Sequence, residues 1–383
     1  MASEGPDVQA AIQASGESTI SKATKRAQEQ IDQLFNVSLH IAVTGESGAG
    51  KSSFVNAIRG LDDDDKGAAE TGVTETTTEP ECYDHPTLPN VKVWDLPGIG
   101  SPTFKGKEYL KKMQFDRFDF FIIISSERFK ENDIMLAKEI KKQKKLFYFV
   151  RSKIDNDIRA EETKKNFNKE ETLSRIKRNC IENLKQFDNP KVFLISSKDI
   201  KAFDFEELAE TLMADLPEKK RHALMQSVPV TSEAMLKKKV KMFEKAAWAA
   251  AVCSGAIAVV PVPGLSVACD ASILVSFFLR CYYSFGLDDN SINKLSERVN
   301  KPHLKSLIKS PLIAALTEKT AIRLQLSALA GGAALEYLCS LVPGVGSVAA
   351  AGISFGCTYA LLKKGLKDLE SAAFTVLREA GLE

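Results

Sequence analysis

The sequence predicts an α/β fold with a mostly parallel sheet and helices on both faces, followed by a purely helical region. Short apolar runs alternate with helical patterns through the first part of the chain, which is typical of parallel strands joined by crossover helices. After Leu216 the strand-like runs cease and only helical periodicity remains. The expected strands lie near residues 38–44, 91–95, 119–125, 146–150 and 192–196.

A helix is expected before the first strand, from about Ser18 to Phe35. Its apolar residues recur at helical spacing, and they are Ile20, Ala23, Ala27, Ile31 and Leu34. The chain therefore divides into an N-terminal helical segment (1–37), an α/β domain (38–216) and a C-terminal helical domain (217–383). We expect the two helical segments to form one all-α domain.

The first expected strand runs directly into an octapeptide that fits the pattern G-x-x-x-x-G-K-[ST]. It consists of Gly45, Glu46, Ser47, Gly48, Ala49, Gly50, Lys51 and Ser52, and Ser53 continues into a helix. A loop of this kind leaves its backbone N–H groups free to surround phosphates at a helix N-terminus. We expect this phosphate loop to place Lys51 on the β- and γ-phosphates and Ser52 on Mg²⁺.

The segment after the strand at 146–150 predicts which base accompanies the phosphates. Ser152, Lys153 and Asp155 resemble the [NT]-K-x-D guanine signature, with Ser152 in place of Asn or Thr. A carboxylate at Asp155 accepts two hydrogen bonds from guanine. Adenine would leave that carboxylate unpaired, at a cost of roughly 1–3 kcal/mol.

A second segment supports the same base. Ser196, Ser197 and Lys198 follow the strand at 192–196 and look like the S-A-K turn that offers a backbone N–H to the guanine oxygen. The order of the segments along the chain is also that of GTPases. The predicted cofactors are therefore GTP or GDP, with Mg²⁺.

The strand at 91–95 ends in a D-x-x-G sequence. We expect Asp95 to hold Mg²⁺ through water and the Gly98 N–H to sense the γ-phosphate. Ile99 stands where Ras-type GTPases carry a Gln that orients the attacking water. Because an alkyl side chain cannot position water, hydrolysis by one copy alone is expected to be slow unless another group replaces the Gln.

A threonine-rich stretch, residues 71–78, falls where a first switch loop belongs. Thr77 or Thr71 is expected to complete the Mg²⁺ shell. Glu75 is a candidate for orienting water or for contacting a second nucleotide across a dimer, so Lys51, Gly98 and Glu75 are the candidate catalytic residues. A solvated turn or sheet edge is the alternative interpretation of this stretch.

Together, the phosphate loop, the stretch from Thr71 to Thr77 and the sequence from Trp94 to Gly100 resemble the interferon-inducible immunity-related GTPases of vertebrates, and the similarity extends along essentially the whole chain. Lys51 is typical of the Lys-type (GKS) effector subclass. The resemblance implies GTP-dependent dimerisation or oligomerisation, and cell-autonomous immunity at pathogen vacuoles. The implied partners are copies of this chain, related GTPases and intracellular membranes of the vacuole, endoplasmic reticulum or Golgi.

A second function fits the same residues: a GTP-loaded switch or scaffold that recruits a protein or lipid partner, with incidental hydrolysis. Composition limits the choice of partners. The 52 basic and 50 acidic residues give a net charge of +2, and the basic clusters lack interleaved aromatics, so no nucleic acid is expected. Cysteines without C-x-x-C spacing, and the lack of a signal-peptide pattern, indicate a cytoplasmic protein. Peripheral association with intracellular membranes is what the resemblance implies.

Two uncharged runs, 246–268 and 337–362, are long enough to span a bilayer. Each is broken by a Pro-Gly pair, so buried helical hairpins are expected instead of membrane spans. Beyond the second run, Lys363, Lys364 and Lys367 alternate with leucines. They predict either an amphipathic face for an anionic membrane or an ordinary solvated helix face.

Overall fold

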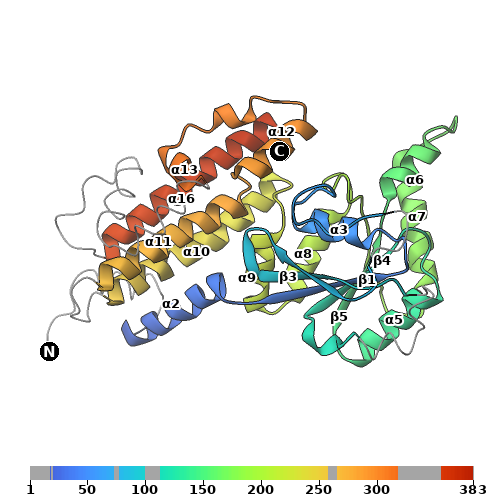
Figure 1. Ribbon diagram of the computed structural model, residues 1–383, viewed down its shortest axis with the longest axis horizontal. Coiled ribbons are helices and arrows are strands. Elements are labelled where there is room, and N and C mark those ends of the chain that lie inside the picture. Colours follow the sequence, from blue (N-terminus) through green and yellow to red (C-terminus); the bar gives the residue numbers. More distant parts are fainter. Residues whose placement is uncertain are drawn as a thin grey trace. The chain divides into compact units, whose positions relative to one another are not determined.

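The computed structural model describes residues 18, 20–72, 77–99, 113–257, 265–317 and 355–382 of the 383-residue chain. The chain forms two compact units (Figure 1). One unit is Ser38–Val228, and the other combines the chain up to Val37 with the chain from Pro229 onward. The α/β unit extends past the predicted limit at Leu216 because helix α9 (Glu218–Ser227) contacts β1 and β3.

The α/β unit contains a six-stranded sheet with the order β2-β3-β1-β4-β5-β6. The strands are β1 (Leu39–Gly45), β2 (Glu81–His85), β3 (Leu88–Asp95), β4 (Phe120–Ser125), β5 (Leu146–Arg151) and β6 (Val192–Leu194). All neighbouring strands are parallel except β2 and β3, which are antiparallel. The predicted, mostly parallel sheet is confirmed, and β2 is the strand that the sequence did not predict.

Helices cover both faces of this sheet (Figure 1). Those in the described part of the unit are α3 (Lys51–Ile58), α5 (Glu131–Lys142), α6 (Ile154–Glu161), α7 (Lys169–Asn183), α8 (Phe205–Asp215) and α9. Phe121 and Phe149 pack with buried residues of α5 and α7. The neighbouring Tyr148 faces the other side of the sheet, where its hydroxyl donates to Asp215 Oδ2 of α8 at 2.9 Å. This alternation is the period-2 pattern of a strand buried on both faces.

The parallel strands bring their carboxyl ends to one edge of the sheet. The register pairs Val43 with Asp95 and Gly45 with Ile124, and it pairs Ser125 with Arg151. Ligands of open α/β sheets bind in the loops at this edge. The predicted phosphate loop, D-x-x-G segment and guanine segments therefore all leave the sheet on the same side.

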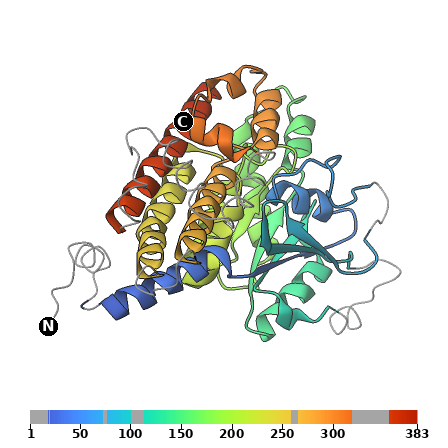
Figure 2. The same cartoon turned by 60° about the vertical axis from the view of Figure 1, so that its left-hand side comes forward.

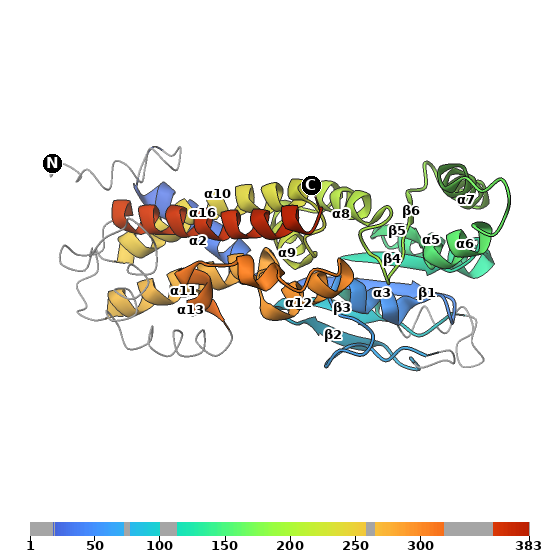
Figure 3. The ribbon, with the colours of Figure 1, turned by 90° about the horizontal axis from the view of Figure 1, so that it is seen from above.

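Among the described residues, the helical unit contains α2 (Ile20–Phe35), α10 (Glu233–Ile257), α11 (Leu265–Ser284), α12 (Asp289–Arg298), α13 (Pro311–Leu316) and α16 (Phe355–Glu379). Helix α10 contacts α2, α11 and α16, so it is the central helix of this unit (Figures 2 and 3). The predicted N-terminal helix is confirmed as α2, and its Ala23, Ala27, Ile31 and Leu34 are buried. Both Pro-Gly breaks lie outside the described residues, although α10 and α11 flank the first.

No helix in the described part of the chain is both long enough and apolar enough to cross a membrane. In α16 the leucines that alternate with lysines are buried in the helical unit, namely Leu361, Leu362, Leu366 and Leu369. Lys363, Lys364 and Lys367 are exposed. The outward face of this part of α16 is therefore basic, and its leucines belong to the protein core.

Candidate nucleotide-binding site

The phosphate loop joins β1 to α3 and requires glycine at its two ends. A Cβ atom at Gly45 would lie 2.0 Å from the carbonyl oxygen of Ile124, a backbone atom that cannot move aside. Gly50 caps the N-terminus of α3 with a φ of 85°, in the left-handed region that favours glycine. Within the loop, the Lys51 ammonium donates to the carbonyl oxygen of Glu46 at 3.1 Å. This contact folds the lysine back over the loop that would hold the phosphates.

Asp95, the last residue of β3, receives hydrogen bonds from two hydroxyl groups. Ser52 Oγ donates to Asp95 Oδ2 at 2.5 Å, and Thr77 Oγ1 donates to the same oxygen at 3.1 Å. Of the two candidate threonines, Thr77 is the one that reaches Asp95. The carboxylate is completely buried, and its Oδ1 has no hydrogen-bond partner among the described residues.

This cluster suits a hard cation. Burial raises the pKa of Asp95, while the hydrogen bond from Ser52 and the charge of Lys51 act in the opposite direction. A buried carboxylate with an unpartnered oxygen is stabilised by a positive charge nearby. Carboxylate and hydroxyl oxygens are ligands that Mg²⁺ accepts. Asp95, Ser52 and Thr77 therefore fit the predicted Mg²⁺ site.

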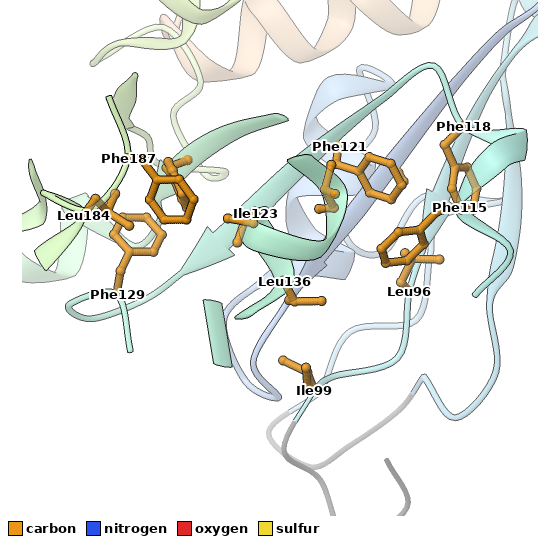
Figure 4. Close-up of a cluster of buried hydrophobic side chains, with 14 of the residues drawn as sticks. Leu96, Ile99, Phe115, Phe118, Phe121, Ile123, Phe129, Leu136, Leu184 and Phe187 are labelled. Carbon is orange, nitrogen blue, oxygen red and sulfur yellow. The ribbon is translucent and has the colours of Figure 1, made fainter. Parts of the chain in front are cut away.

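The D-x-x-G segment lies directly against the phosphate loop. Ile99 N donates to the carbonyl oxygen of Gly45 at 3.1 Å. A Cβ at Gly98 would lie 2.7 Å from both Cα and N of Ser47, so only glycine permits this approach. The Ile99 side chain is 1% exposed and belongs to the core cluster with Leu96 and Leu136 (Figure 4). It is part of the hydrophobic core. Glu75 lies outside the described residues.

The guanine turn, residues 152–155, is hydrogen-bonded to the phosphate loop. Ser152 Oγ donates to the carbonyl oxygen of Ala49 at 2.6 Å, and Lys153 Nζ donates to the carbonyl oxygen of Gly48 at 2.8 Å. The serine that replaces Asn or Thr thus still ties the turn to the phosphate loop. Asp155 follows in the first turn of α6 and is partly exposed.

The second guanine segment adjoins the first. Ile154 N donates to the carbonyl oxygen of Ile195 at 3.4 Å. Ser196 is fully buried, and its Oγ accepts a hydrogen bond from Asp199 N at 3.2 Å, so its side chain stabilises the turn itself. Ser197 is partly exposed and Lys198 exposed. The structure thus brings both predicted base segments to one place beside the phosphate loop.

The start of α5 is a part of the site that the sequence did not predict. Lys130 Nζ lies 2.9 Å from Glu46 Oε2, and Asn132 Nδ2 donates to Glu46 Oε1 at 3.4 Å. Asp133 caps the helix by accepting from Lys130 N at 3.0 Å. Burial raises the pKa of Asp133 to about 7, and its Oδ1 has no partner in the described part of the chain. The only sequence signal for this region is a helix-capping pattern, which indicates no ligand.

Comparisons with known proteins identify the family of this chain. Residues 6–344 match the family model described as interferon-inducible GTPase (IIGP). The chain is 39% identical to interferon-inducible GTPase 5 of Rattus norvegicus over 361 residues, which cover 92% of this chain and 78% of the relative. It is 43% identical to T-cell-specific guanine nucleotide triphosphate-binding protein 2 of Mus musculus over 288 residues, which cover 74% and 69% of the two chains.

A solved structure of a probable GTP-binding protein, engB, is 15% identical, with a TM-score of 0.29 over 48% of this chain and 98% of that one. The fold assignment therefore rests on the sheet topology itself, and the family assignment on the sequence matches. The resemblance drawn from the motifs is confirmed: the chain belongs to the interferon-inducible GTPase family and is a GTPase of the immunity-related type.

Proposed function

We propose that this GTPase hydrolyses GTP with Mg²⁺, that two or more copies assemble when GTP is bound, and that assembly completes the catalytic site. The main support for assembly is the burial of the Ile99 side chain in the core, at the position where Ras-type GTPases have a side chain that orients water. The residues that we expect to contact the phosphates and the base lie together within one copy. A group that orients water is what we expect a second copy to add.

The chain's own residues have distinct roles in this proposal. Ser52, Thr77 and Asp95 would hold Mg²⁺, directly or through water, and Lys51 would bind the β- and γ-phosphates. When bound, Mg²⁺ neutralises charge that develops on the phosphate oxygens. Asp155 would select guanine by accepting hydrogen bonds that adenine cannot donate. The Gly98 N–H would sense the γ-phosphate by donating a hydrogen bond to it.

The second copy would supply what Ile99 cannot. In other GTPases a residue donated across an interface stabilises the transition state and replaces a missing intrinsic group. Glu75, which lies outside the described residues, is our candidate for this role or for contacting the nucleotide of the partner copy. Related GTPases are the other proposed partners, in keeping with a Lys-type effector.

The exposed lysines of α16 support peripheral association with anionic intracellular membranes. Because the leucines beside Lys363, Lys364 and Lys367 are buried, we propose that this face acts through charge and not through insertion of apolar side chains. Such contact would place an assembling GTPase on vacuole membranes around pathogens, or on the endoplasmic reticulum or Golgi.

The deciding measurement is GTP turnover per molecule across a series of protein concentrations, with light scattering recorded in parallel. We expect specific activity and scattering to rise together with GTP, but not with GDP. A flat specific activity would favour the alternative function, a GTP-loaded scaffold with incidental hydrolysis. Lys51→Ala should remove both signals through loss of nucleotide binding, whereas Lys66→Ala, in an exposed loop, should retain them.

Membrane binding has its own test. The triple variant Lys363→Gln, Lys364→Gln, Lys367→Gln should float less well than the wild type with vesicles containing phosphatidylserine, and high salt should weaken binding by the wild type. Lys305→Gln with Lys309→Gln, outside α16, provides the control. Equal flotation of the triple variant and the control would exclude the α16 face as the membrane contact.

A further inference from the structure

A small cavity at the carboxyl edge of the sheet lies outside the contacts assigned to the nucleotide. Its volume is about 260 Å³. Its lining comes from the end of β5, the segment before α5 and one face of α7, and consists of Arg128, Arg151, Arg175, Ile176, Asn179 and Cys180. Pockets for drug-sized ligands are usually about 300–1,000 Å³. This arginine pocket therefore suits a smaller ligand.

The charge of the lining predicts the kind of ligand. Arg128, Arg151 and Arg175 contribute guanidinium groups, and no carboxylate lines the cavity. Arg175 forms an ion pair with Glu161 at 2.9 Å, whereas the Arg128 guanidinium has no hydrogen bond or ion pair within the described residues. A guanidinium group matches the geometry of phosphate oxygens. The arrangement favours an anion with several oxygen atoms.

Arg151 connects the arginine pocket to the guanine turn. Its side chain is 9% exposed and pairs with Asp157 Oδ2 at 2.6 Å. Its Nη1 donates to the carbonyl oxygen of Ser152 at 2.8 Å and to that of Ser126. A guanidinium carries five N–H donors, and these contacts use three of them. Two donors are thus left without a partner in the described part of the chain.

Cys180 adds no charge of its own. Burial raises the pKa of its thiol to about 11, so the sulfur is uncharged near neutral pH. A neutral thiol neither competes with an anion for the guanidinium groups nor acts as a nucleophile. Together with Ile176 it forms an uncharged part of the lining, so the positive charge comes from the arginines.

We propose that the arginine pocket binds a small phosphate-class anion, either inorganic phosphate or a phosphomonoester, and that its occupancy is coupled to guanine-nucleotide binding through Arg151. Two of the three protein partners of Arg151, the Ser152 carbonyl and Asp157, lie in or next to the guanine turn. An anion that fixes the guanidinium therefore also fixes the turn that holds the base. The coupling is reciprocal by thermodynamic linkage.

Isothermal titration calorimetry of the full chain tests the site. The protein is first saturated with Mg²⁺ and the β,γ-imido analogue of GTP, so that the phosphate loop is filled. Inorganic phosphate and glycerol phosphate are then titrated separately, at an ionic strength held constant with chloride. We expect saturable binding of at least one of them, and the stronger of the two identifies the source of the phosphate group.

Two variants and one control locate the binding. Arg128→Gln and Arg175→Gln should each weaken it about tenfold, because each removes charge-assisted hydrogen bonds. Arg178→Gln, an exposed arginine on α7 outside the pocket lining, should bind like the wild type. No saturable binding to either ligand, or equal affinity in all variants, would overturn the proposal.

The coupling is measured separately, by the dissociation rate of a fluorescent GDP. At a saturating concentration of inorganic phosphate or glycerol phosphate, we expect GDP to dissociate from the wild-type protein about fivefold more slowly than in chloride. A fivefold effect is the lower end of typical allosteric coupling. Arg128→Gln should lose this response. Because Arg128 lies outside the phosphate loop, loss of the response in this variant would also show that the slower dissociation does not come from phosphate bound next to GDP in that loop. An unchanged rate in the wild type would overturn the coupling.

Discussion

Ser52 Oγ and Asp95 Oδ2 are joined by a 2.5 Å hydrogen bond, although the two residues lie 43 positions apart in the chain. The bond connects the first turn of α3 to the end of β3, and Thr77 donates to the same carboxylate oxygen. Both donors bind Oδ2, and Oδ1 has no hydrogen-bond partner among the described residues. A cation beside this oxygen would balance the buried negative charge.

The first prediction is that Asp95→Asn lowers the affinity for Mg²⁺ and the rate of GTP turnover together. An amide lacks the negative charge that attracts the ion, and loss of a group that supports a metal typically costs about 10–100-fold in affinity or activity. Turnover measured across a Mg²⁺ titration gives both quantities. Asp64→Asn, in an exposed loop, should behave like the wild type. An unaltered Mg²⁺ midpoint in Asp95→Asn would remove Asp95 from the metal site.

The second prediction concerns the base. Asp155→Asn should weaken GDP binding by about 10–150-fold, since hydrogen bonds to a charged group contribute roughly 1.5–3 kcal/mol. The same variant should gain affinity for xanthosine diphosphate, whose base accepts where guanine donates. Competition binding with both nucleotides measures the switch, with Asp188→Asn as an exposed control. Unchanged selectivity would show that another residue recognises the base.

The third prediction is that Ile99→Gln does not create an active site within one copy. Because the side chain at this position is buried in the core, the glutamine amide would have to enter an apolar cluster. We expect the variant to lose about 2–4 kcal/mol of stability without faster turnover at low protein concentration. Denaturant unfolding and dilute GTPase assays measure the two effects.

Ile99→Val is the matched control for that experiment. It shortens the buried side chain without adding a polar group and should cost only about 0.5–1.5 kcal/mol. A dilute Ile99→Gln protein that hydrolyses GTP faster than both the wild type and Ile99→Val would contradict the proposed need for a second copy.

The fourth prediction is a pH effect at Asp133. Its folded pKa of about 7 lies above the ordinary value of 3.8, so the folded protein binds a proton that the unfolded chain has released. The protonation of Asp133 therefore favours the folded state at low pH, and its effect makes the free energy of unfolding fall as pH rises from about 4 to about 7. Glu46, Lys51 and Lys130 are the charged groups that act on this carboxyl.

Asp133→Asn should remove this dependence and keep an oxygen for the Lys130 N–H. Relative to the wild type, the variant should gain roughly 2–4 kcal/mol of stability between about pH 5 and about pH 8. Denaturant unfolding of the nucleotide-free protein at several pH values provides the comparison, and Asp64→Asn should follow the wild type. Parallel curves for Asp133→Asn and the wild type would exclude a buried, proton-binding Asp133.

The sequence predicted those parts of the fold that have a strong local signal. The parallel strands are apolar runs such as 120–124, and the site residues follow them in recognisable motifs. Strand β2 escaped prediction because it is a half-exposed edge strand, Glu81–His85, with no apolar run. Its pairing with β3 depends on the neighbouring strand and not on its own composition.

Contacts between distant positions were beyond sequence reasoning. Lys130 and Glu46 are 84 residues apart, and each alone is an ordinary charged residue. The arginine pocket gathers side chains from separate elements, and no local pattern relates them. The D-x-x-G motif also identified the position of Ile99 but not where its side chain points. That side chain lies in the core because it packs in one cluster with Leu96 and Leu136.

The hydrogen bonds from Ser152 and Lys153 to the carbonyls of Ala49 and Gly48 have a consequence for ligands smaller than GTP. Guanosine alone would order the guanine turn, and through these hydrogen bonds also the phosphate loop. Triphosphate alone would order the phosphate loop and, through the same bonds, the turn. Each fragment would thus increase the affinity for the other. The two halves of GTP should therefore bind more tightly as one molecule than their separate affinities and the covalent link between them would predict.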